Sequence, residues 1–446
     1  MIHTGLSPNT ERDDLLLTLK VLFTPWTWKR HAARKKLENL LSEKLSVTSS
    51  GSQNSSQRNF LVSTVDSGRT ALFTILKAMG IGDGDEVILQ AYTCVAVPDP
   101  ILWAEATPVY VDCEDDLTMS LEDLKNKVTE QTRAIVVQHT FGQPARIKEI
   151  LEFAREKKIA VIEDCAHALG GEISSERVGK NGGTHDMQPL GSFADASFFS
   201  FGRDKSISSV FGGAIATSSP ELHQKISALV AAYPLPSLIW IKQQLMHPLV
   251  LAAAKVTYNF PSFGKSSARI TLGKIILEIA KRLHIISKAV QSTELSGGKP
   301  TFFGHQFSGA LAQLAYHQLQ KLPRFTAHRQ EIAQQYSAAL SGRSDINAPA
   351  FIPGHAYLRY TVVISENNLN VQNVESYFLK ARAKGIQLGD WYTTVIAPRG
   401  VQYEKIGYEM GSCPNAERLA STTFNLPTHI GINHKAASEI IKILFG

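Results

Sequence analysis

A serine and a lysine, five positions apart, follow an apolar run and precede two glycines. The run is Phe198-Phe-Ser-Phe-Gly-Arg-Asp-Lys205, and Gly212-Gly213 comes after it. Upstream, Asp164 closes the apolar segment Ala160-Val-Ile-Glu-Asp164. A lysine can form an imine with an aldehyde, a carboxylate can keep a pyridine nitrogen protonated, and a hydroxyl can bind a phosphate. These three residue types therefore indicate a site for a phosphorylated pyridine aldehyde, pyridoxal 5′-phosphate (PLP).

Two local elements are expected to position these groups. Ala160–Asp164 is typical of a buried parallel strand, so Asp164 is expected at the carboxyl end of a sheet, where ligands bind in open α/β folds. Asp66-Ser-Gly-Arg-Thr-Ala-Leu72 introduces a helical pattern, and the start of a helix offers free N–H groups to a phosphate. Taken singly, a lysine after a strand is usually a solvated loop residue, and an aspartate at a strand end is more often a cap or turn residue than a cofactor partner. The helix start alone is as typical of an ordinary N-cap as of a phosphate site.

Strands and helices alternate between residues 60 and 217. The predicted strands are Glu86–Leu89, Pro108–Val111, Ala134–Gln138, Ala160–Glu163, Ala196–Ser200 and Gly213–Ala216, and the helices include Leu121–Lys127 and Ile147–Lys157. This alternation predicts an α/β fold with a mostly parallel, doubly wound sheet. A later strand, Tyr357–Ile364, and helices at Val371–Lys384 and His434–Leu444 predict a smaller C-terminal α/β domain.

Four regions are expected along the 446 residues. These are an N-terminal helical segment and linker (1–58), a PLP-binding large domain (59–219), a helical insertion (220–300) and a C-terminal small domain (301–446). Within the first region Met1–Leu45 is predicted to be helical, and Ser46–Arg58, rich in Ser, Gln, Asn and Gly, is predicted to be a mobile linker.

Composition limits the function classes. The net charge of +6 is modest for this length, and no nucleic-acid-binding motif accompanies it, so no nucleic-acid partner is expected. The four cysteines lie singly, which indicates a reducing cytoplasm and no metal site. Met1–Arg12 is polar and lacks the apolar core of a signal peptide.

The insertion contains a basic amphipathic pattern. Apolar residues at helical spacing are Leu272, Ile275, Ile276, Ile279, Leu283, Ile286 and Val290, with Lys274, Lys281, Arg282 and Lys288 mostly opposite. Such a helix either packs on the protein or a dimer partner, which we favour, or lies on an anionic membrane surface, helped by the N-terminal run around Trp26, Trp28, Lys29 and Arg30. Leu235–Val256 is apolar but too interrupted to span a membrane.

In their order and spacing, these motifs resemble the DegT/DnrJ/EryC1/StrS family of fold-type I PLP-dependent sugar aminotransferases. The motifs are Ser67-Gly-Arg-Thr-Ala-Leu72, Gly82-Asp-Gly-Asp-Glu-Val-Ile88, Glu163-Asp-Cys-Ala-His-Ala-Leu-Gly170, and Ser200 with Lys205 and Gly212-Gly213. The resemblance runs from about Leu37 to the C-terminus. It breaks at Pro220–Lys299, after which Phe303-Gly-His-Gln-Phe307 stands where relatives carry a substrate loop of Gly-Xaa-Asn-Tyr-Arg character.

The resemblance implies roles for particular residues. Lys205 would form the internal aldimine and shuttle protons, and Asp164 would pair with the pyridinium nitrogen. His167 falls where the family carries Gln or His near the 3′-oxygen of the cofactor, and Ser200 where it carries a phosphate-binding serine.

Three further residues have implied contacts with the cofactor. Tyr92 matches an aromatic residue that stacks on the cofactor ring, and Gly68 and Arg69 occupy the phosphate-loop turn. The family usually has Thr where this chain has Arg69. The side chain of Arg69 would add charge if it faced the phosphate; if it faced outward, only its N–H would matter.

The implied function is transfer of an amino group from an amino acid, glutamate, to a nucleotide-linked keto sugar, for amino-sugar or polysaccharide biosynthesis. The protein would be a cytoplasmic homodimer. Peripheral membrane contact through residues 220–300 stays the less favoured alternative to internal or dimer packing of that region. Some relatives are dehydratases with His in place of the lysine, and Lys205 argues against that reaction. A non-catalytic or regulatory member that binds PLP or a sugar nucleotide at a membrane is the other alternative, and Lys205, Asp164 and Ser200 together weigh against it.

Overall fold

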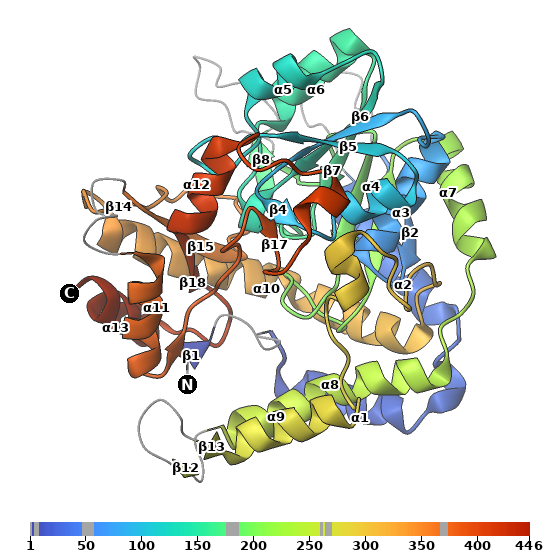
Figure 1. Cartoon of the computed structure of the whole chain (residues 1–446). Coiled ribbons are helices and arrows are strands. Elements are labelled where there is room, and N and C mark those ends of the chain that lie inside the picture. The colour runs from blue at the N-terminus through green and yellow to red at the C-terminus, as the bar shows by residue number, and fades with distance from the viewer. Residues whose placement is uncertain are drawn as a thin grey trace.

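The computed structural model describes residues 2–3, 9–46, 58–174, 187–258, 262–263, 270–365 and 373–446. Residues 47–57 of the predicted linker Ser46–Arg58 lie outside the described residues, so its mobility stays a prediction. Figure 1 shows a central sheet between helices, a smaller sheet beside it, and a pair of adjacent helices along one edge of the molecule.

The central sheet has seven strands in the order β2-β11-β10-β7-β6-β3-β5. Neighbouring strands are parallel except at β11, which is antiparallel to both β10 and β2. Each predicted strand between residues 60 and 217 matches one of these within two residues, and the predicted mostly parallel sheet is confirmed. The strands are β2 (Leu61–Val65), β3 (Glu86–Gln90), β5 (Thr107–Val111), β6 (Thr132–Gln138), β7 (Ala160–Asp164), β10 (Ala196–Ser200) and β11 (Gly213–Thr217).

Alternate residues of these strands face different layers of helices, because side chains along a strand point to opposite sides. In β3, Val87 and Leu89 share a core with α3 (Gly68–Met79) and α7 (Pro220–Ala232). Ile88, between them, belongs to the core formed with α5 and α6. The other helices and short elements of this part are α4 (Pro98–Trp103), α5 (Leu121–Lys127), α6 (Ile147–Lys157), β4 (Thr93–Cys94), β8 (Glu172–Ser174), β9 (Met187–Pro189) and the 3-10 turn η2 (Thr140–Gly142).

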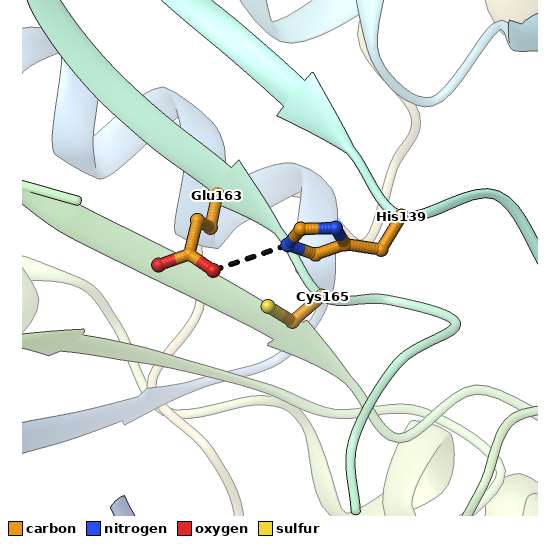
Figure 2. A group of neighbouring side chains, drawn as sticks. All are labelled: His139, Glu163 and Cys165. Carbon is orange, nitrogen blue, oxygen red and sulfur yellow. Dashed lines mark hydrogen bonds and ion pairs between the residues drawn. The ribbon is translucent and has the colours of Figure 1, made fainter. Parts of the chain in front are cut away.

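A buried hydrogen bond between His139 and Glu163 fixes the end of β7 (Figure 2). His139 and Glu163 are fully buried, with 3.1 Å between Nε2 and Oε2. The carboxylate of Glu163 also accepts backbone N–H groups from a single loop, those of Gly191, Phe193 and Ala194. His139 Nδ1 accepts the N–H of Ala145, so its proton lies on Nε2, facing Glu163. Cys165 lies close enough for a three-ligand metal group, but the ligand atoms of the other two residues already have partners.

The smaller sheet is antiparallel, in the order β14-β15-β18. It has its own core with three helices. The predicted strand Tyr357–Ile364 begins two residues late, at Arg359, since Tyr357 has a positive φ of 44°. The elements are α10 (Gly309–Leu340), β14 (Ile346–Asn347), β15 (Arg359–Ile364), α11 (Val374–Ala383), β16 (Ile386–Gln387), β18 (Thr423–Pro427) and α13 (His434–Phe445), and β16 pairs with β1 (Ile2–His3).

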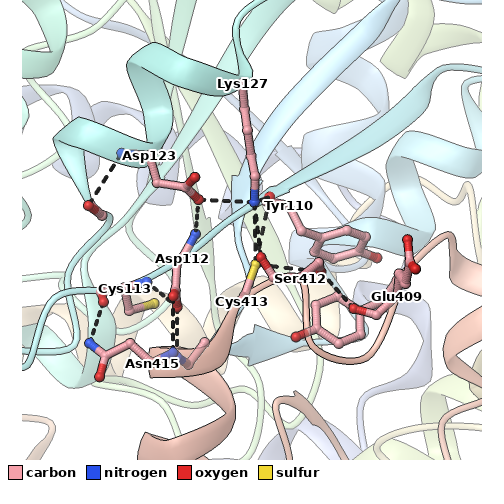
Figure 3. Close-up of polar contacts among 12 residues, drawn as sticks. Tyr110, Asp112, Cys113, Asp123, Lys127, Glu409, Ser412, Cys413 and Asn415 are labelled. Carbon is pink, nitrogen blue, oxygen red and sulfur yellow. Dashed lines mark hydrogen bonds and ion pairs between the residues drawn. The ribbon is translucent and has the colours of Figure 1, made fainter.

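Residues 390–420 cross back onto the central sheet. Strand β17 (Ile396–Ala397) pairs with β4, and the apolar side chains of this stretch enter the same core as α3. Figure 3 shows how Asp112, just after β5, accepts the backbone N–H groups of Asn415 and Ala416 at the start of α12 (Pro414–Thr422). Lys127 adds a bond to the carbonyl of Ser412, and the 3-10 turn η6 (Tyr403–Ile406) packs nearby. This stretch thereby forms one wall above the carboxyl ends of the strands.

Within the predicted insertion 220–300, the part after α7 forms a helical arm, which we define as α8 (Leu238–Val256) and α9 (Leu272–Arg282), with the short strands β12 (Ser262–Phe263) and β13 (Ile270–Thr271) between them. A Cβ on Gly273 would collide with the carbonyl oxygen of Ala254, so the glycine permits the close approach of the two helices. The predicted helical pattern to Val290 is wrong beyond Arg282, because the chain turns there and His284 has a positive φ of 53°. Residues 283–302, which we call the return segment, include the 3-10 turn η4 (Ser292–Ser296).

The predicted N-terminal helical region contains α1 (Arg12–Leu22), a 3-10 turn, η1 (Pro25–Thr27), and α2 (Ala32–Leu45). Helix α1 packs against α8 and α10. Trp28 is buried, with its indole N–H donated to the carbonyl of Val21, whereas Trp26 is exposed. Within the part of the chain that the structure describes, no helix has the length and apolar character needed to cross a membrane.

Candidate active site

A pocket of about 750 Å³ opens at the carboxyl ends of β7 and β10. Its walls come from the end of the central sheet, the start of α3, residues 390–399 and the return segment. The structure brings six of the seven sequence-predicted site residues into this pocket: Gly68, Arg69, Asp164, His167, Ser200 and Lys205. The seventh, Tyr92, does not line it.

Lys205 lies in a turn after β10. Burial lowers the pKa of its amine from 10.5 to about 8, although the neighbouring Cys94 and Asp164 act in the opposite direction. Its own carbonyl and that of Ser206 accept both hydrogens of the Asn9 side-chain amide, at 3.0 and 2.9 Å. Arg329 of α10 donates a third bond to the Ser206 carbonyl. The amine is therefore poised to exchange a proton near neutral pH on a loop fixed by distant parts of the chain.

Asp164 ends β7, on the opposite face of the strand from Glu163. One of its oxygens accepts the N–H of Ala166 at 2.9 Å. Burial raises the pKa of this carboxyl, and the charge of Lys205 partly offsets that effect. Because unbonded carboxylate surface faces the pocket, Asp164 can pair with a cationic ring nitrogen there.

His167 has a buried ring nitrogen, Nε2, whose hydrogen-bonding capacity is not used by the described residues. Its ring stacks between Phe141 and Trp391, each about 5.5 Å away, and its Nδ1 accepts the N–H of Phe141. Burial, and then the charge of Lys205, hold the pKa well below its usual range, so the ring is neutral with its proton on Nε2. That Nε2 is buried without a hydrogen-bond partner among the described residues. A buried N–H without an acceptor fits a ligand oxygen such as the 3′-oxygen of PLP.

The phosphate cradle depends on close backbone approach. Ser67 caps α3 through its hydroxyl, which accepts the N–H of Thr70 at 3.2 Å and leaves the first helical N–H groups free. A Cβ on Gly213 would lie 2.6 Å from the backbone of Ser67, so only glycine allows this contact. The hydroxyl of Ser200 lies beside Gly68, where a Cβ would come within 3.6 Å of it. These donors fit the phosphate of PLP.

The sequence left open whether the side chain of Arg69 faces the phosphate, and the structure shows it bound to the return segment. Its Nε lies 2.5 Å from Glu294 Oε1, and its Nη2 donates to the carbonyl of Ala289, both on the return segment. The charge of its side chain is thereby neutralised by Glu294, and the backbone N–H is its remaining contribution to the cradle.

Tyr92 requires a correction. Its ring is fully buried behind the pocket, and its hydroxyl both donates to and accepts from the backbone of Tyr392. Cys94, two residues later on β4, lines the pocket instead.

Sequence reasoning missed two residues contributed by the C-terminal part. The guanidinium of Arg359, at the start of β15, lies 4.1 Å from the centre of the Trp391 ring, and Lys205 Nζ lies 5.1 Å from the same ring. Arg359 is buried, and its positive charge lies next to Trp391, a residue of the pocket wall. In the sequence, Arg359 is marked only as an arginine that starts a strand after Gly354-His355. That pattern does not indicate which part of the fold the arginine contacts.

Comparison with known proteins agrees with this geometry. Residues 58–232 and 277–445 match the DegT/DnrJ/EryC1/StrS aminotransferase family, and the unmatched 233–276 contain α8. A GDP-perosamine synthase of Escherichia coli O157:H7 is 36% identical over 163 residues, 36% of this chain and 42% of that protein. A UDP-N-acetyl-3-dehydro-alpha-D-glucosamine 3-aminotransferase of Acidithiobacillus ferrooxidans is 36% identical over 165 residues, again 36% and 42%. These alignments thus span less than half of each relative.

Similarity of fold extends further. A protein of Streptococcus pneumoniae named as a sugar aminotransferase, solved in its PLP form, superposes with a TM-score of 0.69 at 20% identity, covering 98% of this chain and 97% of that one. This match confirms the fold-type I architecture. With the family match over both segments, the chain belongs to the DegT/DnrJ/EryC1/StrS aminotransferase family, whose cofactor is PLP.

Proposed function

We propose that this protein is a PLP-dependent aminotransferase that moves an amino group from an amino acid, with glutamate as the proposed donor, to a keto sugar linked to a nucleotide. The observation that carries the proposal is the convergence of Lys205, Asp164 and His167 in one buried pocket beside the phosphate cradle. Bound there, PLP supplies a reactive aldehyde and an electron sink.

Each of the pocket residues would have a separate role in catalysis or cofactor binding. Lys205, with a pKa of about 8, can release its proton to act as a base and take it back as an acid at Nζ. Asp164 would hold the ring nitrogen protonated, and the N–H of His167 would orient the ring through its oxygen. Ser200 and the free N–H groups of α3 would anchor the phosphate.

A nucleotide-linked acceptor is supported by two observations. The two sequence relatives carry GDP and UDP in their names. In this chain, Arg399 is exposed at the pocket wall and offers a cation to a diphosphate, whereas Arg382 on the same wall is paired with Glu375 at 3.6 Å.

The test is amine transfer by purified PLP-loaded protein. Glutamate and a panel of nucleotide-linked keto sugars should yield 2-oxoglutarate and an amino sugar, both measured by mass spectrometry. Lys205→Ala should abolish transfer. PLP binding without any transfer across the panel would favour the non-catalytic alternative, and loss of water from the sugar without gain of nitrogen would favour a dehydratase.

We also propose that the active unit is a homodimer, since fold-type I relatives build each site at a subunit interface. Light scattering combined with activity across a dilution series tests this. A fully active monomer would rule it out.

Peripheral membrane contact is proposed for the arm and α1. The exposed large apolar side chains on these elements or just beyond them are Leu16, Leu19, Phe23, Trp26, Leu238, Ile239, Val256, Leu272, Ile275, Ile279 and Leu283. The exposed cations Lys274, Lys281, Arg282 and Lys288 lie on or just beyond α9. Apolar and aromatic residues beside cations match the chemistry of an anionic bilayer surface.

A liposome assay tests this contact. Each cation near an anionic surface contributes about 1 kcal/mol, so replacing these four by Gln should release protein from anionic vesicles at low salt. A matched control removes the same charge from α6 and the residue after it, at the opposite end of the molecule in Figure 1, through Gln at Lys148, Arg155, Lys157 and Lys158. If wild-type protein ignores anionic vesicles, or the control releases it equally, the arm is not a membrane surface.

A further inference from the structure

The arm is joined to the pocket by the return segment. Ala289 and Val290, a few residues beyond α9, line the pocket wall. Two charged residues of the pocket, Arg203 and Arg69, reach into this segment for their partners. Arg203 lies two positions before Lys205. Arg69 is the second residue of α3, in the phosphate cradle.

The first connection is a hydrogen-bond relay. Arg203 Nη2 donates to the hydroxyl of Ser287 at 2.6 Å, and that hydroxyl donates to Gln244 Oε1 of α8 at 2.7 Å. Burial lowers the pKa of Arg203 to about 10, and its Nε lacks a partner within the described part of the chain. His247 of α8 also lies near Arg203, as a buried and neutral ring. The serine is therefore one of few groups that hold this guanidinium, and with it the direction of the turn that carries Lys205.

The second connection is a buried ion pair. Glu294 is fully buried, and its carboxylate contacts Arg69 Nε at 2.5 Å and accepts the N–H of Gln291 at 2.6 Å. Arg69 also donates to the Ala289 carbonyl and lies over the ring of Phe302 at 5.9 Å. All of these partners belong to the return segment. The start of α3, whose N–H groups form the phosphate cradle, is thus tied to the same segment as the Lys205 turn.

We propose that Ser287 and Glu294 are positioning residues for the cofactor site: the return segment holds the Lys205 turn through Arg203 and the phosphate cradle through Arg69. The proposal rests on the proposed function in that the pocket receives PLP. Neither residue is proposed to contact the cofactor itself. Their effect is to fix two loops that must bind two different groups of one rigid molecule, the aldehyde and the phosphate, which lowers the cost of ordering those loops on binding.

The experiment measures PLP retention separately from turnover. The rate of PLP release, followed by absorbance in the presence of a trapping apoenzyme, should rise roughly tenfold in Ser287→Ala and in Glu294→Gln, which corresponds to about 1.4 kcal/mol for each lost bond. Ser287→Thr keeps the hydroxyl and should restore the wild-type rate. Gln244→Met keeps the volume but removes the acceptor of the relay, so it should give a smaller increase and serves if Ser287→Ala does not fold.

Matched controls separate local destabilisation from positioning. Ser421→Ala removes an exposed serine that donates to a helix carbonyl, and Glu221→Gln breaks an exposed i,i+4 pair with Lys225. Both should leave PLP release within twofold of wild type. Release rates in Ser287→Ala and Glu294→Gln that match these controls would overturn the proposal while the function stands. Wild-type protein that holds no PLP on Lys205 would instead overturn the proposed function.

Discussion

Lys205 is expected to titrate near pH 8 in the cofactor-free protein, far below an ordinary lysine. Removal of the ammonium from water lowers its pKa from 10.5 to about 8. At about 1.4 kcal/mol per pKa unit, this shift of roughly 2.5 units corresponds to about 3 kcal/mol against the charged form. Near pH 8 about half of the amine is then neutral, whereas an unperturbed lysine would be roughly 0.3% neutral.

The lowered pKa of Lys205 also makes the stability of the folded protein depend on pH. Between pH 8 and 10.5 the unfolded chain binds more protons at this site than the folded chain, so this lysine makes stability rise with pH across that window. Below pH 8 both states are charged and the full cost of about 3 kcal/mol is present. Lys205→Met should therefore raise the free energy of unfolding at pH 7 by up to that amount and remove this part of the rise.

Competitive labelling with trace acetic anhydride from pH 6 to 11, read by mass spectrometry of the peptide that contains Lys205, measures the titration directly. Denaturant unfolding of Lys205→Met at pH 7 and pH 10 measures the stability. Lys225→Met, at an exposed site on α7, is the control and should change neither quantity. A labelling midpoint above about pH 10, or no stabilisation at pH 7, would refute the reasoning.

Three other substitutions probe the site and its supports. Asp164→Asn keeps the shape but cannot supply negative charge to a pyridinium nitrogen, so turnover should fall by orders of magnitude with an unchanged circular dichroism spectrum; near-normal kinetics would make Asp164 a structural residue. Burial and then Glu294 raise the pKa of Asp99 to about 8, so this carboxyl makes stability fall as pH rises from about 4 to 8, and Asp99→Asn should remove that decline in unfolding measured at pH 5 and 8. An equal decline in both proteins would contradict this. Glu163→Gln places an amide against backbone donors and should cost about 3 kcal/mol in thermal unfolding, with a loss below 1 kcal/mol arguing against an ionised Glu163.

The site residues that could be predicted from the sequence are those fixed by local geometry. Asp164 and Ser200 lie at the ends of strands whose apolar runs identify them, and parallel strands bring their carboxyl ends to one edge. Gly68 lies where a short capping motif starts a helix. In each case strand or helix periodicity determines the position within a residue or two, so little tertiary information is needed.

The residues that could not be predicted depend on contacts distant in sequence. Tyr92 is turned away from the pocket by the backbone of Tyr392, 300 positions later. Trp391 approaches Lys205 only because residues 390–420 fold back over the sheet, and Arg359 of the smaller sheet lies over the same Trp391 ring. The helical spacing to Val290 was compatible with a longer α9, yet tertiary contacts of the return segment with the pocket win over that local pattern.

The turn that carries Lys205 is held by three segments that lie outside the central sheet. Asn9 comes from the N-terminal region, Arg329 from α10, and Ser287 from the return segment through Arg203. Helix α1 also packs on α8 and α10, so the elements near these supports contact one another. Deleting the arm would therefore disturb the turn as well as any membrane surface, and loss of activity in such a deletion would not discriminate between the two. Gln at Lys274, Lys281 and Arg282 on α9, without the change at Lys288 beside Ser287, leaves the Ser287 and Glu294 contacts intact. This set isolates a surface role of the arm from its support of the pocket.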